Sequence, residues 1–251
     1  MLTQQRKAHI LNVLRRTGRI VAKTLSQELA LSEDTIRRDL RELAAEGLLQ
    51  RVHGGALPAS PAVVNFEGRQ HLASDGKAAI GRAAAQMVRP GQVVFLDGGT
   101  TAVQLARHLP SDLKATVVTH SPSIAVELAQ HPNVMVELIG GRLFKHSIVT
   151  VGAVAIEAIS RIRADTYFMG VTGIHVEVGL TTGDSEEAAV KRALFRFAAE
   201  TVVLASSEKL GAASAYVIVQ MSEIQTLVIE RTTPKNVIDV YRKLGITTVL
   251  A

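Results

Sequence analysis

Apolar residues recur at intervals of three and four along residues 4–47, a spacing that predicts short amphipathic helices. We expect one helix over residues 4–16, a second over 22–29, and a third that begins at Ser32 and ends at Gly47. Ser32 is a suitable N-cap, and the acidic residues after it interact favourably with the helix dipole. The apolar positions predict one small core, formed by Ile10, Leu14, Ile20, Leu25, Leu29, Leu31, Ile36, Leu40 and Leu43.

The third predicted helix also has a polar, basic face, and a short β-wing follows it. Residues 48–52 precede a glycine-containing turn at 53–55, which is typical of a small hairpin. In a winged helix-turn-helix the third helix enters the major groove, and basic side chains hold phosphates. A surface ion pair, such as Arg38 with Glu42, is the alternative for each arginine. The predicted DNA contacts are Ser32, Thr35, Arg37 and Arg38 at the start of the helix, with Arg41, Arg51 and His53 against the phosphate backbone.

Net charge supports a polyanionic partner for this region. Residues 1–58 contain ten Lys/Arg and six Asp/Glu, a net charge of +4, whereas the remaining eighteen Lys/Arg and seventeen Asp/Glu leave +1. A basic excess confined to one unit is typical of nucleic-acid binding, although a solvated surface is the alternative. The chain has no cysteine and no long apolar segment, so we expect a cytoplasmic protein without metal or cofactor.

The segment TIRRDLRELAAEGLLQRVHGGA, residues 35–56, resembles the signature of the DeoR/GlpR-type family of bacterial repressors of sugar metabolism. The resemblance implies a DNA-binding repressor whose second domain senses a phosphorylated metabolite. It extends over nearly the whole chain. We therefore expect a DNA-binding domain at residues 1–58, a linker at 59–75, and an effector domain at 76–251.

Beyond residue 76, apolar runs alternate with amphipathic helical segments, which predicts an α/β domain with a mainly parallel sheet. The predicted strands are residues 93–96, 116–119, 134–139, 166–169, 201–205, 227–229 and 247–250. The predicted helices are one that begins at Lys77 and those at residues 102–108, 123–129, 154–159, 186–199 and 235–243. The resemblance implies a domain similar to ribose-5-phosphate isomerase and the CoA-transferase fold.

The turn Asp97, Gly98, Gly99, Thr100 and Thr101 directly follows a predicted strand and precedes a helix. Two glycines allow an anion to approach the backbone, and a helix N-terminus presents free N–H groups to it. The segment lacks the Walker and dinucleotide-binding patterns. We expect a phosphate cradle here, with a plain tight turn as the alternative. A similar loop in the resembling family supports the cradle.

Other turns after strands are expected at the same edge of the sheet. His120 stands where the family usually has Asn, so it either alters ligand choice or caps a helix. Glu67 and Arg69 resemble a family E-x-R element, with a solvated ion-pair region as the alternative. The further predicted effector contacts are His120, Gly140, Gly141, Glu187, Lys191 and Lys209. For the two glycines, relief of backbone crowding is the alternative. Glu187 and Lys191 are also spaced as an ordinary i,i+4 pair.

These features predict a homo-oligomeric repressor, a dimer or tetramer, that binds an operator and is released by a phosphorylated sugar or similar anion. The alternative is a sugar-phosphate isomerase with an appended DNA-binding unit. Such an enzyme needs a carboxylate base beside the phosphate, and Asp97, Asp165 and Glu187 are the available residues. Each of these carboxylates also has a structural explanation, so we expect a regulator without enzymatic activity.

Overall fold

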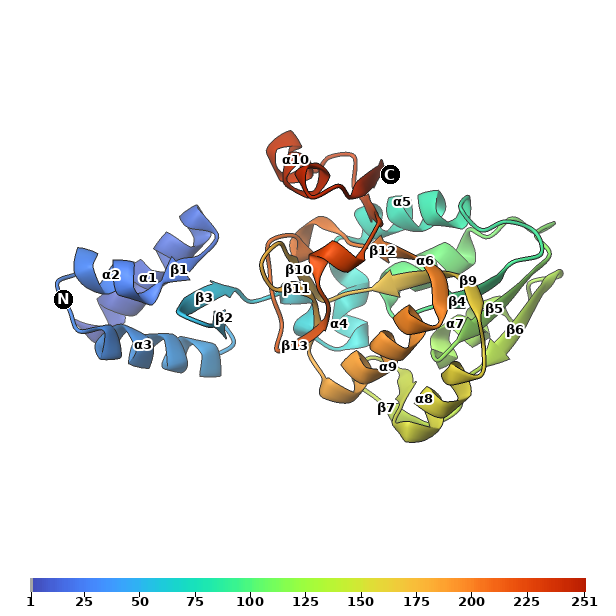
Figure 1. Cartoon of the computed structure of the whole chain (residues 1–251), viewed down its shortest axis with the longest axis horizontal. Helices are drawn as coiled ribbons and strands as arrows, with labels where there is room; N and C mark the ends of the chain where they lie inside the picture. Colours follow the sequence, from blue (N-terminus) through green and yellow to red (C-terminus); the bar gives the residue numbers. More distant parts are fainter. Residues whose placement is uncertain (1) are drawn as a thin grey trace.

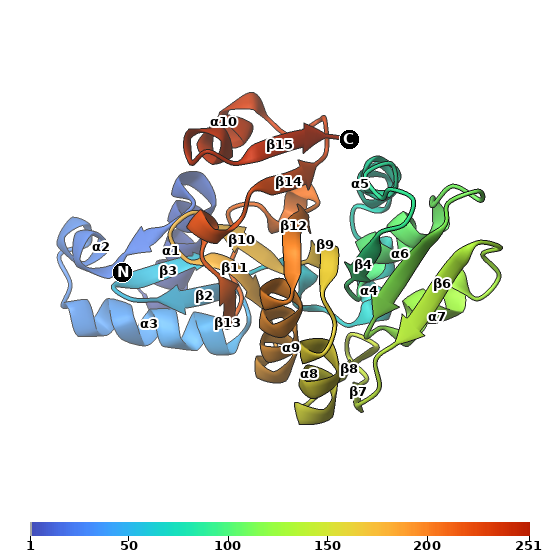
Figure 2. The same cartoon turned by 45° about the vertical axis from the view of Figure 1, so that its right-hand side comes forward.

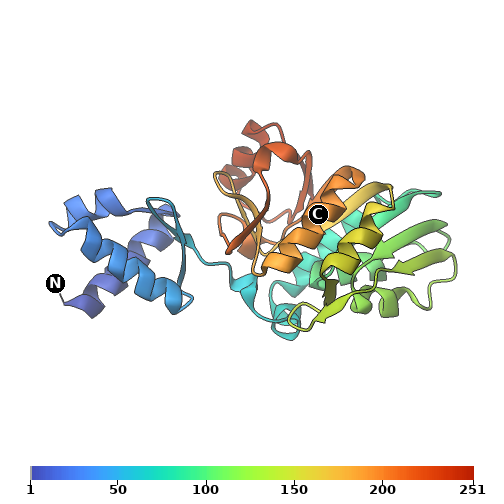
Figure 3. The same cartoon turned by 60° about the horizontal axis from the view of Figure 1, so that its bottom comes forward.

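Three helices and a three-stranded sheet form the N-terminal part of the molecule, which stands apart from the larger C-terminal part in Figures 1 and 3. The structure is a computed structural model and describes residues 2–251. The sheet has the strand order β1-β3-β2. The elements of this part are α1 (Thr3–Thr17), β1 (Ile20–Val21), α2 (Ala22–Glu28), α3 (Glu33–Ala45), β2 (Leu49–Val52) and β3 (Gly55–Pro58).

The core of the N-terminal part contains the apolar residues that the helical spacing predicts, with Leu29 and Leu31 only partly buried at its margin. Strand β1 was not predicted, because two residues are too few to show an alternating pattern. Gly55 lies where β1 and β3 approach most closely. A Cβ atom there would lie 1.7 Å from the carbonyl oxygen of Ile20, so only glycine fits. The winged helix-turn-helix that the sequence predicts is confirmed.

The connection after β3 contains more structure than the expected linker at residues 59–75. A 3-10 turn at Pro61–Val63 precedes the short helix α4 (Phe66–His71). Asn65 caps α4, because its Oδ1 accepts a hydrogen bond from the Gly68 amide at 2.9 Å. A six-residue helix is too short to produce a recognisable apolar period, which is why the sequence did not reveal it.

The C-terminal part is built on a seven-stranded parallel sheet with the order β15-β14-β12-β9-β4-β5-β6. All seven predicted strands are present. The strands are β4 (Val93–Leu96), β5 (Ala115–Thr119), β6 (Val134–Leu138), β9 (Ala164–Gly170), β12 (Ala198–Leu204), β14 (Thr226–Ile229) and β15 (Thr247–Leu250). The helices are α5 (Ser74–Ala85), α6 (Thr100–Arg107), α7 (Pro122–Leu128), α8 (Ala153–Ser160), α9 (Ser185–Arg196) and α10 (Lys235–Lys243).

Helices cover both faces of this sheet, and each face has its own apolar core (Figure 2). Side chains alternate between the faces, so Tyr167 packs with α8, α9 and α10, whereas Phe168 packs with α5, α6 and α7. The predicted mainly parallel α/β fold is therefore confirmed. None of the helices within residues 2–251 is both long enough and apolar enough to cross a membrane.

Two small antiparallel groups of strands were not predicted. One is the hairpin of β7 (Arg142–Phe144) and β8 (Val149–Val151); the other is a sheet of β10 (Gly173–His175), β11 (Gly179–Thr182) and β13 (Tyr216–Val219). Their strands have three or four residues each, which is too short for a clear alternation. The helix predicted to run to residue 199 ends at Arg196 instead, because the chain enters β12 at Ala198.

The direction in which strands are added reverses between β4 and β9, which are neighbours in the sheet. From β4 the chain continues to β5 and β6 on one side, and from β9 it continues to β12, β14 and β15 on the other. Ligands of such sheets bind beyond the carboxyl ends of the strands at this point. The loops after β4 and β9 are therefore the first place to look for an effector site.

Candidate DNA-binding surface and effector site

The N-terminus of α3 is capped as the sequence predicts. Ser32 Oγ accepts a hydrogen bond from the Thr35 amide at 3.2 Å and lies 2.9 Å from Thr35 Oγ1. Arg37 pairs with Glu33 at 2.7 Å, and this hydrogen bond raises the pKa of Arg37. Arg38 and Arg41 are exposed on the same helix. All five predicted DNA contacts of this helix thus remain reachable from solvent, with Thr35 only partly exposed.

The alternative partner proposed for Arg38 is engaged elsewhere, since Glu42 lies 3.1 Å from Lys7 of α1. Arg51 in β2 and His53 in the following turn are exposed, and the turn reverses at Gly54 with a φ of 75°. The helix face and the wing therefore present exposed basic side chains, the arrangement that phosphate contacts require.

A buried ion pair that the sequence did not indicate holds α3 in place. Arg6 of α1 donates two hydrogen bonds to Asp39 of α3, one of them from Nη2 to Oδ1 at 3.0 Å. Asp39 is fully buried and Arg6 is 6% exposed. The hydrogen bond from Arg6 to Asp39 also raises the pKa of Arg6. The guanidinium group of Arg6 therefore fixes the angle between α1 and α3.

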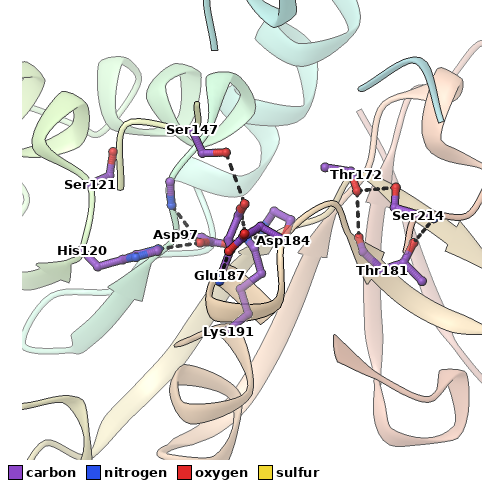
Figure 4. Close-up of polar contacts among 12 residues, drawn as sticks. Asp97, His120, Ser121, Ser147, Thr172, Thr181, Asp184, Glu187, Lys191 and Ser214 are labelled. Atoms are coloured by element: carbon purple, nitrogen blue, oxygen red, sulfur yellow. Dashed lines mark hydrogen bonds and ion pairs between the residues drawn. The ribbon is translucent and has the colours of Figure 1, made fainter. Parts of the chain in front are cut away.

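Asp97 is the centre of a buried polar network behind the predicted phosphate loop (Figure 4). Its Oδ1 accepts from the Gly98 amide at 2.8 Å and from His120 Nε2 at 2.9 Å. Its Oδ2 accepts from the Gly170 amide at 2.7 Å and from Lys191. Burial alone would raise the pKa of Asp97, but the charge of Lys191 and the hydrogen bond from His120 hold it well below its usual range.

Asp97 and His120 lie behind the predicted phosphate loop, and their direct contact with the effector stays a prediction. Both side chains are fully buried, and the remaining ring nitrogen of His120 lies 3.0 Å from the carbonyl oxygen of Thr150. Asp97 ties the carboxyl ends of β4 and β9 together, so its role is to shape the loop. A carboxylate with four donors and a depressed pKa is also a poor general base, which weighs against the isomerase alternative.

A small cavity of about 30 Å³ opens in front of this network, which we call the cradle cavity. Glycines are required in its loop: a Cβ on Gly98 would lie 2.2 Å from Val149 Cγ1, and Gly99 has a φ of +113°. The first amides of α6 have no partner within the helix, and they face the cavity with Thr100 and Thr101. The lining residues are Arg69, Gly98, Gly99, Thr100, Thr101, Ala102, Gly170, Val171, Thr172, Glu187, Lys191 and Lys209.

Lys209 supplies an unpaired positive charge to the cradle cavity. It is 5% exposed, and its Nζ has no hydrogen-bond or ion-pair partner among residues 2–251. Burial, the largest cause, and the nearby charges of Lys77, Arg69 and Lys191 together lower the pKa of Lys209 to about 8, against the opposing charge of Glu208. The buried hydroxyl of Thr101 likewise lacks a partner within the described chain. An anion in the cavity would satisfy both groups.

Arg69 lines the cradle cavity and Lys77 contacts Arg69, although the sequence did not place either residue among the effector contacts. Arg69 donates to the carbonyl oxygen of Val64 at 2.6 Å and to Ser147 Oγ at 3.3 Å. Lys77 donates to the carbonyl oxygen of Arg69 at 2.6 Å. Burial lowers the pKa of both cations. The family-like E-x-R element at residues 67–69 was the available signal, and its arginine is buried rather than solvated.

The remaining predicted effector contacts divide into two groups. Lys191 and Glu187 line the cradle cavity, and they also form the i,i+4 pair that their spacing allows, at 3.5 Å. Gly140 and Gly141 do not line it; they turn the chain from β6 into β7. A Cβ on Gly141 would lie 2.9 Å from the carbonyl oxygen of Val151, so backbone crowding explains this glycine.

Comparison with known proteins matches both parts of the chain. The family described as DeoR-like helix-turn-helix domain matches residues 6–61, and the DeoR C terminal sensor domain matches residues 72–231. The HTH-type transcriptional regulator GlpR of Haloferax volcanii is 36% identical over 251 residues, covering 99% of this chain and 98% of that protein. The HTH-type transcriptional repressor GlcR of Bacillus subtilis is 32% identical over 248 residues, covering 98% and 95%.

Among solved structures, ribose 5-phosphate isomerase A from Methanocaldococcus jannaschii aligns with 54% of this chain and 54% of its own. The sequence identity is 18% and the TM-score is 0.40. A likeness this partial carries no inference about activity.

Proposed function

The chain belongs to the DeoR family of transcriptional regulators, and from that premise we propose that it represses a carbohydrate-utilisation operon and is released by a phosphorylated sugar. The DNA contacts in this proposal are Ser32, Thr35, Arg37, Arg38, Arg41, Arg51 and His53. Exposed arginines on α3 and in β2 support it, because they suit base edges and phosphates respectively.

The observation that carries the effector proposal is the unpaired, buried ammonium group of Lys209 beside the N-terminus of α6. A buried cation without a partner destabilises the ligand-free fold, so its retention suggests a partner that arrives from outside. A phosphate monoester supplies two negative charges and several acceptor oxygens. It would accept hydrogen bonds from Lys209, the Thr101 hydroxyl and the first amides of α6.

Control of DNA binding then requires two units held at the spacing of two operator half-sites. We propose a homo-oligomer, a dimer or tetramer, in which the effector favours an arrangement that misplaces the two α3 helices. Coupling of about 1–3 kcal/mol is sufficient, since it changes affinity by roughly 5- to 150-fold. An effector with equal affinity for both arrangements would release nothing.

The test is a gel-shift assay on the DNA upstream of the protein's own and neighbouring genes, repeated with a panel of pentose and hexose phosphates. Release by one compound supports the proposal. The variant Arg38→Ala should weaken operator binding and keep the melting shift caused by that compound. The variant Thr100→Ala should keep operator binding and reduce the melting shift. Loss of both properties in either variant would contradict the proposed division between the two parts.

Isomerised product in the same incubations would instead favour the enzyme alternative. A melting shift without product is the result that the repressor proposal predicts.

A further inference from the structure

A second cavity, of about 280 Å³, lies between the DNA-binding part and the effector part, and we call it the interdomain cavity. From the DNA-binding part it is lined by the end of α3 and by β2, through Ala44, Gly47, Leu49 and Gln50. From the other side it is lined by loops of the effector part, including the segment that follows β7. Pockets for small ligands typically begin at about 300 Å³, so this space is close to the size of a sugar.

The two cavities share walls. Arg69, Thr172 and Glu187 line both the cradle cavity and the interdomain cavity. The cradle cavity measures only about 30 Å³, so it can hold at most the phosphate end of a ligand. A phosphorylated sugar therefore cannot lie wholly inside it, and the part that carries no phosphate must extend past these shared residues.

The shared wall consists of polar groups that suit sugar hydroxyls. Ser147 Oγ accepts a hydrogen bond from Arg69. It donates one to Glu187 Oε2 at 3.2 Å (Figure 4). Asp184 and Gln50 lie on the same lining. Gln50 Nε2 donates to the carbonyl oxygen of Arg51 at 3.2 Å, which leaves Gln50 Oε1 to accept from a hydroxyl. Sugar hydroxyl groups can form hydrogen bonds with these side chains, because a hydroxyl is both a donor and an acceptor.

Few contacts hold the two parts in the arrangement that forms this cavity. An exposed ion pair joins Arg19 to Glu177, and such pairs contribute little to stability. The connection docks through Ser60, which donates to the carbonyl oxygen of Thr172, and through a backbone hydrogen bond from Ala213 to Pro58 at 3.2 Å. A ligand that contacts both parts would therefore substantially stabilise their docked arrangement.

We propose that the effector bridges the two cavities, with its phosphate in the cradle cavity and its sugar hydroxyls in the interdomain cavity against Gln50. The DNA-binding part is then itself a wall of the effector site. Binding favours the docked arrangement because only that arrangement completes the site. This inference rests on the proposed function, since it requires that a phosphorylated sugar is the effector.

The experiment compares inorganic phosphate with the panel of pentose and hexose phosphates by titration calorimetry on the full-length chain. The variants are Gln50→Ala and, as matched control, Gln27→Ala, which changes an exposed glutamine of α2 outside both cavities. Gln50→Ala should weaken binding of the preferred sugar phosphate by about 3- to 10-fold, as expected for one lost hydrogen bond. It should leave inorganic phosphate affinity unchanged, and Gln27→Ala should change neither.

A second variant, Ala215→Leu, places bulk in the interdomain cavity from the effector side and should also weaken only the sugar phosphate. Unchanged sugar phosphate affinity in both cavity variants would overturn the bridge and leave the proposed function standing. An equal loss of affinity for inorganic phosphate would overturn the bridge as well, because the variants would then be disturbing the cradle cavity itself. Absence of sugar phosphate binding to the wild-type chain would overturn both proposals.

Discussion

At the scale of single residues, Lys209 is the side chain whose placement calls most for a ligand. Its folded-state pKa of about 8 lies below the ordinary value for lysine. A base whose pKa falls on folding destabilises the fold while it is protonated, that is, at pH values below about 8. The penalty fades as the pH rises through 8 towards the unfolded pKa of about 10.4.

The variant Lys209→Met should therefore stabilise the ligand-free protein. Removing a desolvated charge and keeping an apolar stem should raise the free energy of unfolding at pH 7 by about 1–3 kcal/mol. Urea unfolding followed by circular dichroism measures this, with the exposed Lys114→Met as a matched control that should change little. A less stable Lys209→Met protein would show that the ammonium group has an internal partner after all.

Effector affinity should fall as the pH rises above 8. A bound phosphate favours the ammonium form of Lys209, so its pKa rises in the complex and binding takes up a proton at alkaline pH. A phosphate monoester has its second pKa near 6 and stays dianionic over this range. Calorimetry between pH 7 and pH 9.5 should show a loss of up to about tenfold per pH unit above 8.

A flat pH profile, or the same slope in Lys209→Met, would contradict this assignment. The neighbouring cations Lys77, Arg69 and Lys191 remain in that variant, so the comparison isolates Lys209 from the rest of the cluster.

At the scale of elements, the long and strongly periodic segments could be predicted from the sequence, and the short ones could not. The strands β4 and β9 and the helix α3 were recognised because burial imposes their pattern over several residues. The helix α4 and the strands of three or four residues carry too few positions for a period. Arg69 was not predicted as an effector contact for the same reason, since it lies on α4.

The sequence also could not show the direction in which a side chain points. The motif at residues 97–101 correctly marked the turn at the reversal of the sheet, but it could not show that Asp97 points inward. His120 and Lys191 meet that carboxylate from β5 and α9, which are far apart in the chain. Only the tertiary fold brings the three together, so their support of the loop was hidden from any local pattern.

The ion pair between α1 and α3 gives a prediction at this scale. Asp39→Asn leaves the buried Arg6 without its full counter-charge, so it should lower the melting temperature and weaken operator binding, with the exposed DNA-facing side chains intact. Thermal melting and a gel-shift assay measure the two effects. The double variant Arg6→Met, Asp39→Leu should regain the melting temperature, because an apolar pair of similar size requires no charge compensation.

Unchanged operator affinity in Asp39→Asn would show that the angle between α1 and α3 does not matter for recognition. That outcome would remove the positioning role assigned to Arg6.

At the scale of the whole molecule, charge and architecture assign DNA binding to the N-terminal part and effector binding to the C-terminal part. The N-terminal part carries most of the net positive charge and an exposed basic helix, while the C-terminal part encloses Arg69, Lys191 and Lys209 around a cavity. The two parts meet at few contacts. A ligand at that meeting point can thus change DNA binding through the relative placement of the parts, without altering α3 itself.

The central claim is that occupancy of the cradle cavity by a phosphorylated sugar lowers affinity for DNA. Fluorescence anisotropy of a labelled operator tests it most directly, with and without the sugar phosphate that most raises the melting temperature, and with inorganic phosphate at matched ionic strength as the control for salt. The account predicts at least about a fivefold loss of operator affinity with the sugar phosphate beyond any effect of the control. A compound that binds and stabilises the protein but leaves operator affinity unchanged would contradict it.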